Sequence, residues 1–189
     1  MITSASNPKL RLAHRLLESR RQREKEGLFV CEGEDLVLAA EDAGIEPVEL
    51  LVSGQDVEPE LLARISTLAH PPRVMGLYRR DSLPRGVEPV SLSLWHVADP
   101  GNVGTLLRSA DAFGASLALS AGCADITGPK ALRASAGAVF RVPTAGFDDV
   151  DARRVALVAH EGRLLHQVGR EVPISFVLGA GETTLLRMR

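Results

Sequence analysis

Two side chains that could do chemistry, Asn102 and Arg108, lie six residues apart in the segment Asp99–Gly114. An amide and a guanidinium can hold a phosphate and polarise a hydroxyl, because both donate directed hydrogen bonds and the guanidinium keeps its charge at every accessible pH. The spacing Asn-x-Gly-x-x-x-Arg is by itself a weak signal. Its meaning depends on the elements that position the two side chains.

The residues around this pair predict a strand, a tight turn and a helix. The apolar run at 92–98 predicts the strand, and Pro100 with Gly101 breaks it. We expect Asn102 to cap a helix over 103–113 by accepting hydrogen bonds from the free backbone donors of its first turn.

The expected helix has an apolar face and a polar face. Its apolar residues are Leu106, Leu107, Ala110 and Phe113, and Gly114 follows them as a stop signal. Arg108 lies away from the apolar face. We therefore expect it to point toward the edge of the sheet at which α/β proteins bind their ligands.

The full run DPGNVGTLLRSADAFGA resembles the first signature motif of the SpoU/TrmH family of RNA 2′-O-ribose methyltransferases, in the SPOUT superfamily. The resemblance implies S-adenosylmethionine as cofactor, no metal, and Asn102 and Arg108 as catalytic residues. Because a guanidinium is effectively never deprotonated, we interpret Arg108 as a phosphate clamp that polarises the ribose hydroxyl, and not as a base. The alternative is that Asn102 only caps the helix and Arg108 forms a surface ion pair.

The strand at 174–178 lies where the second family motif belongs, and the loop after it helps to cradle the cofactor in the family. Leu178-Gly179 match the motif, but Gly181 stands where the family has Glu. The resemblance implies cofactor contacts from the ends of two strands. These residues are Ala159, His160, Leu178, Gly179 and Ala180.

A third family motif, whose Ser and Asn serve catalysis and whose helix closes a deep knot, has no match before Arg189. We expect a C-terminally truncated catalytic domain with an incomplete knot, an exposed apolar sheet face, and fraying from Gly179 onward. Truncation, a frame shift near Gly181 and loss of methyltransferase activity all remain open. A catalytically impaired RNA-binding relic is therefore the alternative function.

Positive charge is concentrated at the start of the chain. Residues 1–25 carry seven Lys or Arg against two Glu, although the whole chain has a net charge of −2. Such asymmetry favours phosphate contacts, and a solvated helix face is the alternative. The predicted RNA-binding residues are Arg20, Arg21, Arg23, Lys130 and Arg133; for the last two a structural surface role is equally compatible.

The order of expected elements indicates an α/β protein with a parallel sheet in its second part. Residues 1–80 resemble the small RNA-binding domain similar to ribosomal protein L30e, 81–90 form a linker, and 91–189 form the SpoU-type domain. The helix that the family implies between the segment ending near Pro143 and the strand starting near Val155 is shortened to 147–154. The family implies a homodimer acting on RNA, with rRNA favoured over tRNA.

Composition excludes other classes. No apolar run approaches a membrane span, and the absence of a signal peptide predicts a cytoplasmic protein. Cys31 and Cys123 are too few for a disulfide framework, and neither they nor the five histidines show metal-ligand spacing. An unrelated nucleotide-binding protein is disfavoured because no complete phosphate-loop signature occurs.

Overall fold

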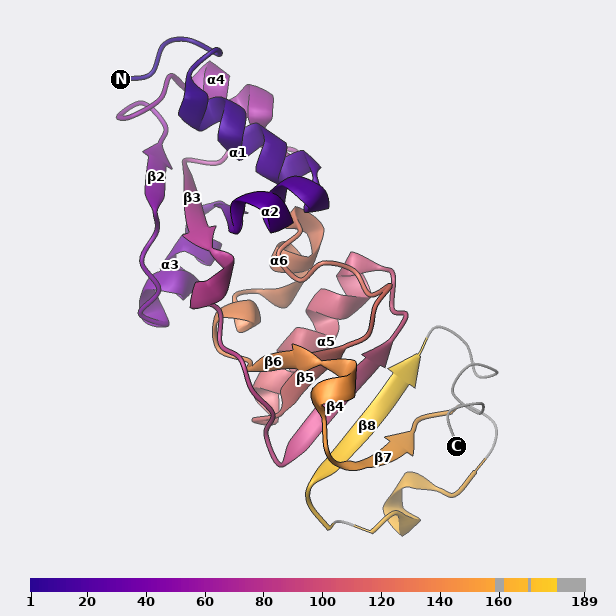
Figure 1. The fold of residues 1–189 in the computed structure, drawn as a ribbon. Coiled ribbons are helices and arrows are strands. Elements are labelled where there is room, and N and C mark those ends of the chain that lie inside the picture. The colour runs from indigo at the N-terminus through magenta and orange to yellow at the C-terminus, as the bar shows by residue number, and fades with distance from the viewer. Residues whose placement is uncertain (159–161, 170, 180–189) are drawn as a thin grey trace.

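A computed structural model describes residues 1–158, 162–169 and 171–179, and it contains two sheets (Figure 1). The first sheet has three antiparallel strands in the order β1-β3-β2. The second has five parallel strands in the order β6-β5-β4-β8-β7. The predicted fold class, α/β with a parallel sheet, is confirmed.

The first sheet is built from the amino-terminal part of the chain. Its elements are α1 (Pro8–Glu18), α2 (Arg20–Glu26), β1 (Leu28–Glu32), α3 (Glu34–Asp42), β2 (Glu49–Val52), α4 (Pro59–Ile65) and β3 (Val74–Arg79). Asn7 caps α1 by accepting from the backbone N–H of Lys9, as the Asn-Pro start predicts. Apolar residues of α1 and α4 pack on one face of this sheet, and Leu36 and Ala40 of α3 belong to the core on its other side.

The parallel sheet follows a short 3-10 turn, η1 (Arg80–Ser82). Its elements are β4 (Val90–Trp95), α5 (Pro100–Ala112), β5 (Ser116–Leu119), α6 (Pro129–Ser135), η2 (Ala138–Phe140), β6 (Thr144–Gly146), η3 (Phe147–Asp149), β7 (Arg153–Ala156), η4 (Leu165–Gln167) and β8 (Ile174–Gly179). Alternation of strand and helix produces parallel pairing, because each crossover returns the chain to the same starting edge.

One apolar core joins the two sheets. Phe29 of β1, Tyr78 of β3 and Phe140 of η2 form a trio of rings with centroids 5.8 to 6.3 Å apart. The same cluster continues into buried residues of α5 and the parallel sheet, including Leu107 and Leu117. The division into 1–80, 81–90 and 91–189 stays a prediction, since the packing between the two sheets is continuous.

Two local expectations are wrong. Phe113 is 84% exposed at the end of α5, and Val103 takes its place on the buried face together with Leu107 and Ala110. The segment 147–154 is no helix. It forms the single turn η3 and then enters β7 at Arg153, because pairing with β8 supplies the backbone hydrogen bonds that a helix would otherwise make.

The part of the chain that the structure describes contains no helix long and apolar enough to cross a membrane. Cys31 and Cys123 are both buried and free, as expected.

Helices α5 and α6 touch backbone to backbone at Gly104. A Cβ placed there would lie 2.5 Å from the carbonyl oxygen of Ala131 and 2.5 Å from Cβ of Ala134. We predict that Gly104→Ala lowers the free energy of unfolding by about 1–2 kcal/mol, because overpacking outweighs the roughly 1 kcal/mol gain in helix propensity. Urea denaturation measures the free energy of unfolding, and Thr105→Ala on the exposed face of α5 is the control. A stabilised Gly104→Ala variant would contradict this packing.

Candidate functional site

Asp99, and not Asn102, caps helix α5. The Asp99 carboxylate accepts a hydrogen bond of 2.8 Å from the backbone N–H of Asn102, and Pro100 takes the first helical position. This backbone hydrogen bond, with Lys130 nearby, holds the pKa of Asp99 below its usual value. The prediction of Asn102 as the cap is wrong, because the helix begins at Pro100, three residues earlier than the sequence suggested. The side-chain amide of Asn102 therefore does not cap the helix.

Arg108 lies on the exposed side of α5, as predicted. The helical period places Asn102 and Arg108 on either side of Thr105, whose hydroxyl bonds back to the carbonyl of Gly101. Within the described residues Arg108 makes no ion pair and no side-chain hydrogen bond. The alternative of a surface ion pair therefore receives no support, and the guanidinium is available to a phosphate.

The carboxyl edge of the parallel sheet brings the candidate residues together. Trp95, the last residue of β4, pairs with Gly179, the last residue of β8, and α5 starts a few residues after Trp95. Leu178 and Gly179 therefore lie at the edge from which α5 begins, with Asn102 in its first turn. Ala159, His160 and Ala180, the other predicted cofactor contacts, lie outside the described residues.

Trp95 is a site residue that sequence reasoning missed. Its ring lies 4.9 Å from that of Phe147, and its indole Nε1 is buried with no hydrogen-bond partner in the described part of the chain. A buried N–H without an acceptor costs free energy, so it marks a place for a polar ligand atom. The available signal was a lone tryptophan ending a strand just before the turn.

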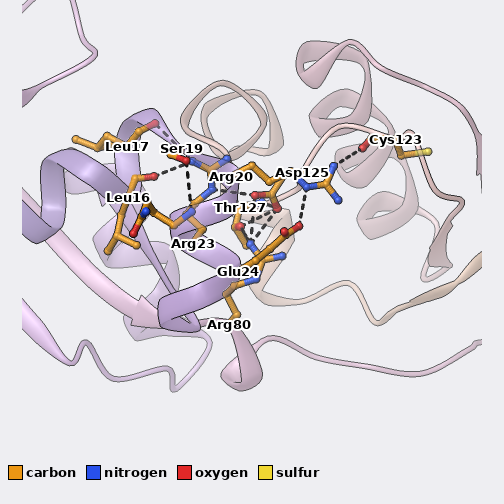
Figure 2. A network of polar contacts seen from close by, with 11 residues as sticks. Leu16, Leu17, Ser19, Arg20, Arg23, Glu24, Arg80, Cys123, Asp125 and Thr127 are labelled. Atoms are coloured by element: carbon orange, nitrogen blue, oxygen red, sulfur yellow. Dashed lines mark hydrogen bonds and ion pairs between the residues drawn. The ribbon is translucent and has the colours of Figure 1, made fainter.

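Arg23 is a structural residue. Its side chain is 7% exposed; Nε donates to Asp125 at 2.8 Å and Nη1 donates to the carbonyl of Leu16 at 2.7 Å (Figure 2). Arg80 approaches the same carboxylate at 3.1 Å and also bonds the hydroxyl of Thr127. We call Arg23, Arg80, Asp125 and Thr127 the Asp125 cluster. The prediction that Arg23 contacts RNA is wrong, because its charge is buried against Asp125.

The neighbouring arginines of α2 differ from Arg23. Arg20 is half-exposed, pairs with Glu24 at 2.7 Å and donates to the carbonyl of Cys123 at 3.0 Å. Arg21 is exposed, and within the described residues its side chain has no polar partner. Of the three predicted contacts, Arg21 is thus the one whose charge is fully available.

The predicted RNA contacts Lys130 and Arg133 on α6 also have protein partners. Lys130 lies 3.6 Å from Asp99, and Arg133 donates to Thr67 at 2.8 Å and lies 3.4 Å from Glu32. The Glu32 side chain is only 2% exposed. Arg133 therefore links α6 to the first sheet, which is the structural role left open for it, while Lys130 stays exposed beside the start of α5.

No group of three or more His, Cys, Asp or Glu side chains in the described residues could hold a metal ion. The polar groups at the carboxyl edge are instead an amide, a guanidinium and an indole N–H. Such groups bind and polarise a ligand through hydrogen bonds and charge.

The fold and the site define a class of protein. A parallel sheet whose central strand β4 leads into a helix bearing exposed polar residues is typical of α/β proteins that bind ligands beyond the carboxyl edge of the sheet.

Residues 89–179 match the model of the SpoU rRNA Methylase family. The human protein named rRNA methyltransferase 3, mitochondrial, is 33% identical over 156 residues, covering 68% of this chain and 37% of that protein. A 23S rRNA (uridine(2479)-2′-O)-methyltransferase of Streptomyces viridochromogenes is 30% identical over 174 residues, covering 75% of this chain and 61% of that protein. The chain thus spans between about a third and two thirds of the length of these relatives.

Solved structures agree with this match. A putative RNA methyltransferase of the TrmH family from Porphyromonas gingivalis superimposes with a TM-score of 0.79 at 28% identity, covering 95% of this chain and 82% of that one. An AdoMet-bound rRNA methyltransferase from Sinorhizobium meliloti shares the fold, with a TM-score of 0.82 at 22% identity over 99% and 85% of the chains. Residues 89–179 thus form a domain of the SpoU rRNA Methylase family, and the resemblance stated from the sequence is confirmed for this domain.

The Asp125 cluster yields a prediction on stability. Burial by itself raises the pKa of Asp125, but the charge of Arg80 and the hydrogen bonds from Arg23 and Thr127 outweigh burial and lower it. We predict that Asp125→Asn lowers the free energy of unfolding by about 3 kcal/mol at neutral pH, since it leaves buried guanidinium charge without its partner. Urea denaturation measures the loss, with the exposed Asp148→Asn as control.

The pH dependence follows from the direction of the shift. A carboxyl with a lowered folded pKa stabilises the fold above its unfolded pKa of about 3.9, and this contribution is lost as the pH falls through the folded value. The difference between wild type and Asp125→Asn is therefore expected to be full at neutral pH and to shrink below about pH 4. A difference that stays constant down to acid pH would contradict this assignment.

Proposed function

We propose that this chain is an S-adenosylmethionine-dependent RNA 2′-O-ribose methyltransferase, with rRNA favoured over tRNA. The observation that carries the proposal is Arg108, exposed and unpaired in the described structure, within the family motif on the helix that leaves the carboxyl edge of the sheet. The names of the relatives, which are rRNA methyltransferases, support the choice of RNA.

Arg108 and Asn102 divide the work on the substrate. Arg108 holds a phosphate next to the target ribose, which fixes the position of the 2′-hydroxyl. Its positive charge also stabilises the negative charge that develops on the hydroxyl oxygen as the methyl–oxygen bond forms and the hydroxyl proton passes to solvent water. The side-chain amide of Asn102, on the other side of Thr105 from Arg108, orients the ribose 2′-hydroxyl by a hydrogen bond.

S-adenosylmethionine is proposed to bind at the carboxyl edge of the sheet. A cavity of about 360 Å³, within the usual range for small-molecule sites, lies along β7 and is bordered by residues 153–158 and by Gly162, Arg163, Leu165 and Val168. The buried Nε1 of Trp95 lies at that edge and has no acceptor among the described residues. Leu178 and Gly179 end the adjacent strand β8. When bound, the cofactor supplies an activated methyl group; Ala159, His160 and Ala180 are proposed as further contacts.

The RNA surface is proposed to run from the first sheet to the start of α5. Residues 1–80 act as an L30e-like RNA-binding domain, with Arg20 and Arg21 on phosphates and Lys130 beside the site; Arg133 contributes through its exposed part. The proposal includes a homodimer and a cytoplasmic location.

The second candidate, an impaired RNA-binding relic, is favoured by one observation, the Gly181 that stands where the family has Glu. Isothermal titration with S-adenosylmethionine separates the two. Micromolar binding supports the enzyme, and no binding at millimolar cofactor supports the relic.

Arg108→Ala is expected to reduce methyl transfer by about 10²–10³-fold or more, because it removes the charge that stabilises the reacting oxygen. Transfer of labelled methyl from S-adenosylmethionine to rRNA measures the effect. The melting temperature should stay at the wild-type value, since the side chain is exposed. Arg73→Ala, at another exposed arginine, is the control. Full activity of Arg108→Ala would refute the catalytic assignment.

Neutralising Arg20 and Arg21 to Gln is expected to weaken RNA binding and to flatten its dependence on salt. If both touch phosphates, the slope of log affinity against log salt falls by about 1.4–1.8 units, at about 0.7–0.9 per contact. Fluorescence anisotropy across a salt series gives the slope. Arg23→Gln is expected instead to lower stability. An unchanged slope in the double variant would make this run a solvated helix face.

A further inference from the structure

A second cavity lies beside β6, where the two sheets meet. It has a volume of about 410 Å³ and is bordered by the linker after β3, the strand β6 and the loop before α6. Its polar lining consists of Arg80, Arg85, Thr127, Thr144 and Asp149. None of the residues in the proposed catalytic or cofactor site lines it.

Backbone hydrogen bonds hold Arg85 in place at this cavity. Thr144 donates its N–H to the carbonyl of Pro84 and accepts from the N–H of Gly86, both at 3.1 Å. Arg85 thereby pairs with Thr144 as a short parallel extension of β6. Its side chain is exposed, and in the part of the chain that the structure describes it has no ion pair or hydrogen bond.

Arg80 supplies a second guanidinium to the same cavity. Its Nη1 is committed to Asp125 and Thr127, but its Nε and Nη2 have no partner among the described residues. The side chain is 26% exposed, so this remaining edge is accessible. A guanidinium anchored through one nitrogen is already ordered, which reduces the entropy lost when the other nitrogens bind a ligand.

The charges favour an anion. Two guanidinium groups line the cavity against one carboxylate, Asp149, whose Oδ2 is engaged by the N–H of Gly146. Asp125, which faces Arg80 from behind, is shared with Arg23. The hydroxyls of Thr127 and Thr144 already donate to Asp125 and to the carbonyl of Pro84, so the two guanidinium groups are the donors that face a ligand. Guanidinium groups form strong charge-assisted hydrogen bonds to phosphate oxygens.

We propose that this junction cavity binds a backbone phosphodiester of the RNA substrate. The identity of the ligand as RNA rests on the proposed function, whereas the anion site itself does not. The cavity lies between the first sheet, which carries the basic helices, and the parallel sheet, which carries Arg108. An RNA strand bound in this cavity is contacted by both sheets. The site therefore fixes the path of the RNA backbone from the first sheet to the parallel sheet.

Protection from chemical modification tests the site in the intact protein. Phenylglyoxal modifies exposed guanidinium groups, and peptide mass spectrometry reports each arginine separately. Inorganic phosphate and a short single-stranded oligouridylate are the two probes. Both are expected to protect Arg85 at least severalfold. Arg73, at the opposite end of β3 from Arg80, is the internal control. It should react with phenylglyoxal at the same rate whether or not phosphate is present.

The outcomes separate the two proposals. Protection of Arg85 by both probes supports an RNA phosphate site. Protection by phosphate alone, with RNA bound elsewhere, overturns the assignment to RNA. Protection by phosphate in a protein that binds no RNA leaves an anion site while the proposed function fails. Equal reactivity of Arg85 with and without either probe overturns the site.

A pair of opposite variants gives a second measurement. Arg85→Gln is expected to lower the salt slope of oligouridylate binding by about one unit, as for the loss of one phosphate contact. Asp149→Asn removes the opposing charge yet keeps an oxygen for the N–H of Gly146, so affinity is expected to rise two- to threefold. Equal affinity of both variants and the wild type at low salt would overturn the proposal. Melting temperatures near the wild-type value establish that both variants are folded.

Discussion

A carboxylate buried between two arginines holds the molecule together. Asp125 lies in the loop before α6, while Arg23 comes from α2 and Arg80 follows β3, so the contact crosses from one sheet to the other (Figure 2). Burying the charges of Arg23 and Asp125 is costly unless each finds partners, and here both oxygens of Asp125 are hydrogen-bonded. Since α6 packs on α5, this contact also sets where Arg108 lies relative to the basic helices.

A second buried carboxylate repeats the arrangement with the roles exchanged. Glu32 belongs to the first sheet and receives Arg133 from α6, together with hydroxyls of Ser66 and Thr67. Each sheet region therefore supplies a carboxylate to an arginine of the other region. Two of the five predicted RNA contacts, Arg23 and Arg133, are paired with carboxylates in this way. A count of basic residues overstates the surface open to a phosphate backbone, because it does not distinguish a paired guanidinium from an unpaired one.

The sequence predicted the fold class, most strands and the exposure of Arg108, because these follow from local periodicity and from the Gly-rich turn. It failed where the outcome depends on distant partners. Arg23 looks like its neighbours on α2 until Asp125, about a hundred residues later, is folded against it. The cap of α5 was misplaced because Asp99 and Asn102 are both good caps, and only the backbone path chooses Asp99. Trp95 was missed because the burial of its indole N–H, with no acceptor in the described part of the chain, is a property of packing.

The linker between the sheets has a consequence of its own. Residues 84–86 are hydrogen-bonded along β6, which is one of the two outermost strands of the parallel sheet (Figure 1). An outermost strand with open backbone groups is a template for pairing with another molecule, and here the chain's own connector covers part of it. The connector thus protects the edge strand β6 from pairing with another molecule, in addition to linking the two sheets. Extra residues inserted there would lengthen the reach between the sheets and at the same time uncover a site for aggregation.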